Sequence, residues 1–269
     1  MLTFVKLGGS VITDKTGQEA PDLPTIRRLA AELRAALDQA GPADRLIVGH
    51  GSGSFGHTYA RRYGVHTGIS AGGDWMGFAL TAAAALRLNR IVVDELIAAG
   101  VPALALQPSA TLLSAAGRLV AWDTAAVARA LERGLVPIVH GDVAFDREQG
   151  SAIVSTEQLL EALIDTPSLR PGRVVLVGEA GVYTADPRAH PGAERIPRID
   201  AGNIDAVLRG AGASHGVDVT GGMRGKVELM WRLVQANPGL TVQLIGTAPG
   251  LLQRALLGRA EGEGTSIRA

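Results

Sequence analysis

The chain begins MLTFVKLGGSVITDK (residues 1–15), where a short apolar run ends at Gly8 and Gly9. The run TFVKL predicts a strand, and the two glycines after it let backbone N–H groups approach an anion closely, because no side chain stands in the way. Lys6 adds a compact ammonium charge that suits a phosphate oxygen. A tight turn beside a solvent-exposed lysine is the alternative interpretation. The segment is not a P-loop, because G-x-x-x-x-G-K-[ST] is absent.

Strand-like runs alternate with helical patterns along almost the whole chain, which favours an α/β fold with a mostly parallel sheet covered on both faces. Strands are expected at 3–7, 45–50, 101–106, 135–142, 173–178, 241–246 and 264–268. Helices are expected at 25–41, 75–99, 155–164 and 222–236, and hairpins at 112–122 and 143–155. No linker, repeat or low-complexity tract interrupts this order, so we expect a single domain over residues 1–269 with two lobes, about 1–170 and about 171–269.

The composition excludes several classes of protein. The formal net charge is zero, from 26 basic and 26 acidic residues, and no basic stripe interleaved with aromatics is present, so nucleic-acid binding is not expected. The absence of cysteine excludes disulfides, thiolate chemistry and cysteine-ligated zinc. The apolar run 2–7 is too short for a signal peptide, and the uncharged stretch 96–117 is broken by glycine and proline. We therefore expect a cytoplasmic protein that does not bind a membrane.

A second glycine motif, GHGSGSFGH (residues 49–57), lies between a predicted strand and a predicted helix. It satisfies G-x-G-x-x-G, but a dinucleotide-binding fold would also need an acidic residue at the end of a second strand roughly 20 residues on. The nearest acid, Asp74, follows GISAGG, which is not a strand, so that interpretation is weakened. The broader inference is that a glycine loop at a helix N-terminus binds an anion. His57 would lie beside this anion and can hold a phosphate, whereas His50, at the strand end, is expected to be structural.

Residues 68–72 match the nucleophile motif G-x-S-x-G of serine hydrolases. That motif requires a strand immediately before it, and RRYGVHT is a poor strand. The match is therefore interpreted as fortuitous.

A third motif, DVTGGMRGKV (residues 218–227), places two glycines before an amphipathic helix, with Lys226 early on that helix. A capped helix with an exposed lysine is the alternative interpretation. The chain has 23 arginines and only three lysines, Lys6, Lys15 and Lys226, and all three stand in glycine-flanked motifs. Phosphoryl transfer needs such mobile point charges along the path of the migrating group.

Taken in order, KLGGSVITDK, GSGSFGH, HGDV, YTADP, DVTGGMRGK and GTSIR resemble the motifs of the amino acid kinase superfamily along the whole chain. The histidine after the G-x-F-G turn, together with the ITDK lysine, is similar to the isopentenyl phosphate branch, beside a fosfomycin-kinase-like branch. The resemblance implies a three-layer αβα sandwich with a central mostly parallel sheet. It also implies a homodimer that uses ATP and Mg²⁺ to convert isopentenyl phosphate to isopentenyl diphosphate, with acceptor binding in the N-terminal lobe and nucleotide binding in the C-terminal lobe.

The resemblance also implies roles for individual residues. Lys15 stabilises the group in transfer, His57 holds the acceptor phosphate, and Glu157 orients the lysines. The implied ATP-binding residues are Lys6, Leu7, Gly8, Gly9, Ser10, Gly53, Gly178, Tyr183, Asp186, Gly222 and Lys226. The implied acceptor-binding residues are Ser52, Gly53, Gly56, His57, Gly141, Asp142, Ser155 and Thr156. No residue is assigned as a metal ligand.

Two departures from the family pattern stand out. Ser52 replaces a glycine in the middle of a GGG run, which a backbone contact tolerates provided that the local φ suits a residue with a side chain. VGEAG (residues 177–181) replaces a TDVDG-like segment, so the nucleotide contacts there are the least secure. A kinase for another small phosphate or phosphonate, and a non-catalytic nucleotide- or ligand-binding regulatory protein, are the alternatives.

Overall fold

The fold is seen in a computed structural model, which describes residues 1–14, 17–70, 72–187, 189–211 and 222–269. Its centre is an eight-stranded sheet in the order β12-β14-β13-β9-β1-β2-β6-β3. Neighbouring strands are parallel, except for β13 and β14. The strands of this sheet are β1 Leu2–Leu7, β2 Arg45–His50, β3 Ala103–Ala105, β6 Val136–His140, β9 Arg173–Val177, β12 Arg198–Ile199, β13 Thr241–Ile245 and β14 Thr265–Ile267.

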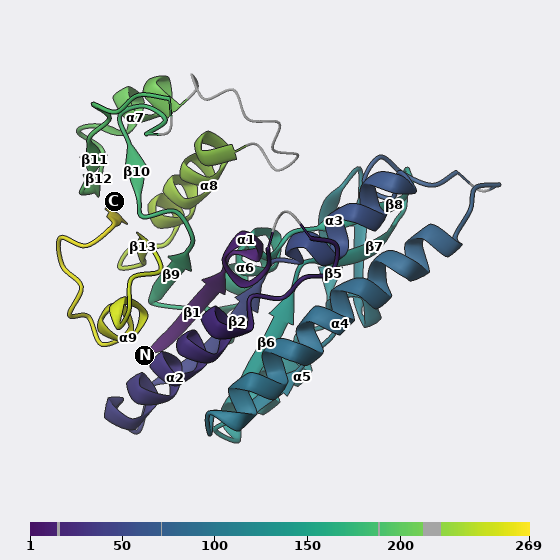
Figure 1. Cartoon of the computed structure of the whole chain (residues 1–269), viewed down its shortest axis with the longest axis horizontal. Helices are drawn as coiled ribbons and strands as arrows, with labels where there is room; N and C mark the ends of the chain where they lie inside the picture. The colour runs from purple at the N-terminus through teal and green to yellow at the C-terminus, as the bar shows by residue number, and fades with distance from the viewer. Residues whose placement is uncertain (15–16, 71, 188, 212–221) are drawn as a thin grey trace.

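Helices cover both faces of the sheet. One core cluster joins the sheet to α2, α4 and α9, and a second joins it to α5, α6, α7 and α8. Figure 1 shows α2 and α4 along the near face, with α5 and α6 behind. The helices are α1 Gly9–Ile12, α2 Leu23–Gln39, α3 Gly53–Arg62, α4 Met76–Ala98, α5 Ala125–Glu132, α6 Thr156–Asp165, α7 Ile204–Ala211, α8 Gly222–Ala236 and α9 Leu251–Leu256. The expectation of a three-layer αβα sandwich with a mostly parallel sheet is thus confirmed.

Strand β1 shows how the sequence sets the two faces. Phe4 packs into the cluster on the α6 side, and Val5 and Leu7 pack into the cluster on the α2 side. Side chains alternate across a strand, so Lys6 shares the face of Phe4 and is directed toward α6. Lys6, a charged residue in a buried strand, therefore lies at the end of the sheet from which the glycine loops begin.

A second, four-stranded sheet in the order β5-β4-β7-β8 stands beside the central one. It is built from the two predicted hairpins, β4 Leu112–Ala115 with β5 Arg118–Trp122 and β7 Asp142–Asp146 with β8 Gly150–Val154. A parallel pairing of β4 with β7 joins them. A short ladder of β10 Val182–Tyr183 with β11 Arg195–Ile196 stands in the segment between β9 and β12.

Helix α4 is long and apolar enough to cross a membrane by length and composition alone. In this fold it lies against the sheet, and Ala84, Leu88, Val92 and Leu96 are buried in the cluster on that face. This packing accounts for its apolar character without a membrane.

Candidate active site

Two glycine loops meet where β1 and β2 end. A Cβ atom on Gly9 would lie 2.5 Å from the backbone nitrogen of Gly53, and one on Gly51 would lie 2.9 Å from the nitrogen of Gly9. Gly53 has a φ of +48°, which favours glycine. Glycine is therefore required here for the close approach of two backbones as well as for access to an anion.

Thr13 ties these two loops together. Its hydroxyl donates to the carbonyl of Gly9 at 2.7 Å and accepts from the backbone N–H of Ser54 at 3.1 Å. Thr13 is 4% exposed. The sequence analysis singled out Lys15 from the ITDK segment and missed Thr13, although the residue lies in the same motif.

Lys6 and Glu157 form an ion pair between β1 and the first turn of α6. Each side chain is only 16% exposed. Burial alone would raise the pKa of the Glu157 carboxyl, but the charge and hydrogen bond of Lys6, with the charge of Lys226, hold this pKa below its usual value. Glu157 is therefore an anion whose charge is felt by both Lys6 and Lys226.

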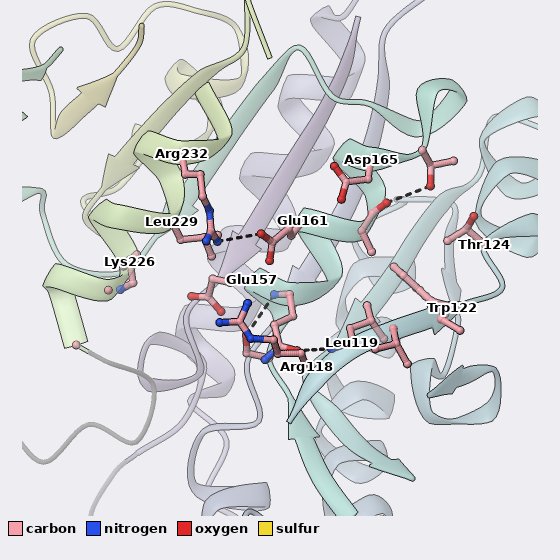
Figure 2. A pocket seen from close by; sticks show the side chains of 18 residues that line it. Arg118, Leu119, Trp122, Thr124, Glu157, Glu161, Asp165, Lys226, Leu229 and Arg232 are labelled. Carbon is pink, nitrogen blue, oxygen red and sulfur yellow. Dashed lines mark hydrogen bonds and ion pairs between the residues drawn. The ribbon is translucent and has the colours of Figure 1, made fainter. Parts of the chain in front are cut away.

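Lys226 lies on α8 and lines a cleft of about 670 Å³ between α6, α8 and β5, which we call the α8 cleft. Glu157, Gly222 and Lys226 line it at one end, and Figure 2 shows Arg232 of α8 reaching Glu161 of α6 further along. Gly222, at the start of α8, has a φ of +61°. Lys15, the third lysine, lies outside the described residues.

A second cavity, of about 410 Å³, lies beside α3 and is called the α3 cavity. Six residues assigned to acceptor binding from the sequence line it: Ser52, Gly56, His57, Gly141, Asp142 and Ser155. Arg61, His66, Thr81 and Gln158 add further polar side chains to the lining. Its apolar lining consists of Ala60, Ala85, Val143, Ala152 and Ile153. Ser155 and Gln158 line both cavities, so the α3 cavity and the α8 cleft adjoin at the start of α6.

The N-terminal end of α3 contributes Ser52, Gly56 and His57 to the lining of the α3 cavity. Ser52 has a φ of −81°, which is an ordinary value for a residue with a side chain. The backbone at this position therefore tolerates serine in place of the glycine of the family pattern. A Cβ on Gly56 would lie 2.6 Å from the Ser52 hydroxyl oxygen. His57 is the fifth residue of α3, one turn beyond the expected first turn, and it is exposed and lines the cavity.

Two buried histidines support the floor of this region. His50 and His140 are paired in register on β2 and β6, and their rings stack with centroids 5.5 Å apart. Nδ1 of each ring lies within hydrogen-bond distance of the next carbonyl, Gly51 for His50 (3.0 Å) and Gly141 for His140 (3.1 Å). The pKa of each imidazole is lowered to about 4, mainly by burial and, for His50, also by the neighbouring His140. The expectation that His50 is structural agrees with this packing.

Asp142 and Ser155 line the α3 cavity, and Thr156 follows Ser155 as the first residue of α6. Asp142 is 2% exposed and accepts from the backbone N–H groups of Ser109 and Val143, and its burial raises the pKa of its carboxyl. Ser155 caps α6 by accepting from the N–H of Gln158. Thr156 is buried and donates to the carbonyl of His50 at 2.8 Å. Its hydroxyl therefore holds the β2 end, and Thr156 is not among the residues that line the α3 cavity.

The residues assigned to the nucleotide from the sequence are spread more widely. Gly178 follows β9, next to Gly8, whose N–H donates to the Val177 carbonyl at 2.8 Å. Tyr183 lies on β10, opposite Arg195 of β11. The carbonyl of Asp186 accepts from the N–H of His190 in the segment that follows β10. Leu7 is buried in the core and Ser10 is exposed on α1, so only the backbone of Leu7 is available to a ligand.

Sequence reasoning also missed residues at the start of α6 and on the β4–β5 hairpin. Gln158 follows Glu157, and its side chain forms hydrogen bonds with the backbone of the hairpin at Gly117 and Leu119. Arg118 lines the α8 cleft. Neither belongs to a motif, and only the approach of the hairpin to α6 brings them to the site. Within the described residues, no group of three His, Asp or Glu side chains could hold a metal ion.

Comparison with known proteins agrees with this geometry. Residues 1–244 match the amino acid kinase family. The chain is 39% identical to the isopentenyl phosphate kinase of Methanothermobacter thermautotrophicus, over 99% of this chain and 98% of that protein. A crystallographic isopentenyl phosphate kinase has a TM-score of 0.80 and 34% identity, covering 99% of this chain and all of that one. A product complex of the T. acidophilum isopentenyl phosphate kinase has a TM-score of 0.75 and 26% identity over the full length of both chains.

The chain therefore belongs to the amino acid kinase family, and within that family to the branch of the isopentenyl phosphate kinases.

Proposed function

We propose that this protein transfers the γ-phosphoryl group of ATP to isopentenyl phosphate, giving isopentenyl diphosphate and ADP. The observation that carries the proposal is the mixed lining of the α3 cavity, in which the polar residues at the start of α3 and apolar side chains such as Val143 and Ile153 face the same space. A monophosphate with a short branched hydrocarbon tail matches this mixed lining, because the phosphate takes the polar groups and the tail takes the apolar ones. The isopentenyl phosphate kinases to which the chain is similar support the same assignment.

On the acceptor side, we assign the phosphate to His57, with Ser52, Gly53 and Gly56 around it. An imidazole N–H and backbone N–H groups at the start of a ten-residue helix suit an anion. The apolar tail would then contact Ala85, Val143 and Ile153.

On the donor side, we assign the triphosphate to Lys6, Lys15 and Lys226 and to the loop from Leu7 to Ser10. The ion pair with Glu157 limits the positions that the Lys6 ammonium can take, which reduces the entropy lost when it meets a phosphate. Gly178, Tyr183, Asp186 and Gly222 are assigned to the nucleotide on the family resemblance.

In the transfer, an oxygen of the acceptor phosphate bonds to the γ-phosphorus while the bond from that phosphorus to the β–γ bridging oxygen breaks. ADP leaves with the electron pair of that bond. The attacking oxygen is already ionised at neutral pH, so no general base is required. The barrier is then mainly repulsion between two anions, which the lysines, His57 and the loop amides offset. Mg²⁺ is proposed to arrive with ATP, held by its phosphates.

A coupled assay of ADP release across a panel of acceptors tests this function. The panel is isopentenyl phosphate, dimethylallyl phosphate, geranyl phosphate, fosfomycin and glutamate. We expect isopentenyl phosphate to give the highest kcat/KM and glutamate to give no turnover. Absence of turnover with isopentenyl phosphate, while another acceptor is phosphorylated, would overturn the assignment.

Two finer expectations accompany the proposal. We propose that the protein acts as a homodimer, which sedimentation equilibrium of the purified chain tests, and that it acts in the cytoplasm, which fractionation of the source cells tests. Both rest on the family resemblance and on the sequence patterns described above.

A further inference from the structure

The tip of the β4–β5 hairpin stands at the junction of the two cavities. Gly117 lines the α3 cavity, and the next residue, Arg118, lines the α8 cleft. Glu157 and Lys226 line the same cleft as Arg118, and Figure 2 shows the Arg118 side chain extending toward the end where these two residues lie. A phosphoryl group that passes between the cavities would therefore pass beside this arginine.

The backbone on both sides of Arg118 is held by one side chain of α6. Gln158 Nε2 donates to the carbonyl of Gly117 at 3.3 Å, and Gln158 Oε1 accepts from the N–H of Leu119 at 3.2 Å. Gln158 directly follows Glu157, so the same turn of α6 holds both Lys6 and the flanks of Arg118.

The other side of the hairpin tip is fixed by Asp146. Its carboxylate accepts from the N–H groups of Ala116 (3.0 Å) and Gly117 (2.8 Å) and from the hydroxyl of Ser114 (2.8 Å). Burial opposes ionisation of this carboxyl, but the hydrogen bonds from Gly117 and other N–H groups prevail and hold its pKa far below the usual value. Arg118 thus starts from a rigid backbone.

The guanidinium of Arg118 has no acidic partner among the described residues, although acids line the same cleft. Arg232, across the cleft, differs in this respect because it pairs with Glu161 at 2.9 Å. An arginine whose backbone is held in place and whose guanidinium is unpaired can bind an anion from solution. Its planar fork matches two oxygens of one phosphate, which a lysine cannot do.

We propose that Arg118 contacts the oxygens of the phosphoryl group in transfer between ATP and the acceptor phosphate. This inference rests on the proposed function, in which the γ-phosphorus leaves the β–γ bridging oxygen and bonds to the acceptor oxygen. Negative charge on the three peripheral oxygens is then opposed by the lysines from one side and by Arg118 from the hairpin side. Gln158 is a positioning residue, which acts through Arg118.

The central test compares Arg118→Gln and Arg118→Lys with Arg232→Gln, a matched arginine on the opposite wall of the cleft. We expect Arg118→Gln to lower kcat roughly a hundredfold, with the KM for isopentenyl phosphate changed by less than about threefold. Arg118→Lys should recover only part of this loss, and Arg232→Gln should stay within about twofold of the unaltered protein. An Arg118→Gln kcat within twofold of the unaltered protein would overturn the proposal, and so would an equal loss in Arg232→Gln.

A binding experiment tests the role of Arg118 whether or not isopentenyl phosphate is the acceptor. Isothermal titration measures MgADP alone and MgADP with aluminium fluoride, which mimics the phosphoryl group in flight. Arg118→Gln should weaken binding of the fluoride complex at least about tenfold and leave MgADP unchanged. This result would stand even if isopentenyl phosphate were not the acceptor, whereas equal weakening of both ligands, or of neither, would refute the role of Arg118.

A double-mutant cycle tests the role of Gln158. Gln158→Leu should lower kcat in the unaltered background and have no further effect in the Arg118→Gln background, because it acts through the same guanidinium. Additive losses would show that Gln158 acts independently and would remove it from the proposal.

Discussion

Lys6 and Glu157 form an ion pair across 151 positions of sequence, and so join the glycine loop after β1 to the first turn of α6. The second lysine acting on this carboxylate, Lys226, comes from α8. Three segments that are distant in the sequence thus share one negative charge at the end of the sheet. This charge offsets part of the repulsion between the two ammonium groups.

Replacing Glu157 by glutamine tests this arrangement. Glu157→Gln leaves the Lys6 ammonium without its counter-charge, so we expect kcat to fall roughly tenfold or more and the free energy of unfolding to fall by about 1–3 kcal/mol. Glu161→Gln, one turn later on the same helix, is the matched control, since Glu161 is 37% exposed and pairs with Arg232. The control should change the unfolding free energy by less than about 0.5 kcal/mol in urea titrations. Equal effects of the two variants would contradict a special role for Glu157.

Lys15 is expected to act on the group in transfer, and Lys6 on the bound nucleotide. Lys15→Ala should therefore lower kcat on the order of a hundredfold while changing the Kd for MgATP less than about threefold. Lys6→Ala should weaken MgATP binding as well, which calorimetric titration measures for both variants. If Lys15→Ala impairs binding as much as turnover, the division of labour between the two lysines is wrong.

His57 is assigned to the acceptor phosphate, so its loss should appear mainly in the acceptor parameters. We expect His57→Ala to raise the KM for isopentenyl phosphate roughly tenfold or more, with a much smaller change in the KM for ATP, because the lost contact is made only to the acceptor. His190→Ala removes an exposed histidine in the segment after β10 and serves as the control. An increase confined to the KM for ATP would show that His57 contacts ATP and would contradict its assignment to the acceptor phosphate.

The stacked pair of His50 and His140 predicts an acid-labile fold. Both side chains are neutral in the folded protein, because their pKa is lowered from 6.5 to about 4, whereas the unfolded chain takes up protons near pH 6.5. Their contribution to stability is therefore fully present above pH 6.5 and is lost as the pH falls from 6.5 toward 4. Urea midpoints measured from pH 7.5 to pH 4.5 should decline over this window.

The variant His140→Phe keeps a ring in the stack and cannot take up a proton. It should flatten the decline below pH 6.5, while His190→Phe, at an exposed position, should leave the decline unchanged. A decline that is equally steep in His140→Phe would assign the acid lability to other groups.

The sequence predicted the elements of the central sheet well, because buried strands and amphipathic helices have clear local periods. The expected helix at 222–236 and the two expected hairpins were found as predicted. Strand β3 is shorter than the expected 101–106, spanning Ala103–Ala105. The joining of the two hairpins through β4 and β7 could not be predicted, since pairing between non-consecutive strands has no local signal.

The residues of the candidate site likewise include some that a local motif indicates and some that only the fold brings together. Residues inside glycine motifs, such as Lys6 and His57, could be chosen as candidates because the motif itself suggests a charge near an anion. Glu157 became a candidate only through the family resemblance. Thr13, Gln158 and Arg118 could not be chosen from the sequence, because their contacts depend on which loop or hairpin the fold brings against them. His50 and His140 were each visible in the sequence, but their stacking follows from the register of β2 and β6.

The central sheet runs without interruption from β12 at one edge to β3 at the other, because β9 pairs with β1 from Thr3 to Leu7. A large rotation of the strands beyond β9 against those beyond β1 would strain this ladder of backbone hydrogen bonds, so the ladder opposes a hinge motion between the two halves of the sheet. For the same reason we expect the two halves to unfold together, in a single transition on heating.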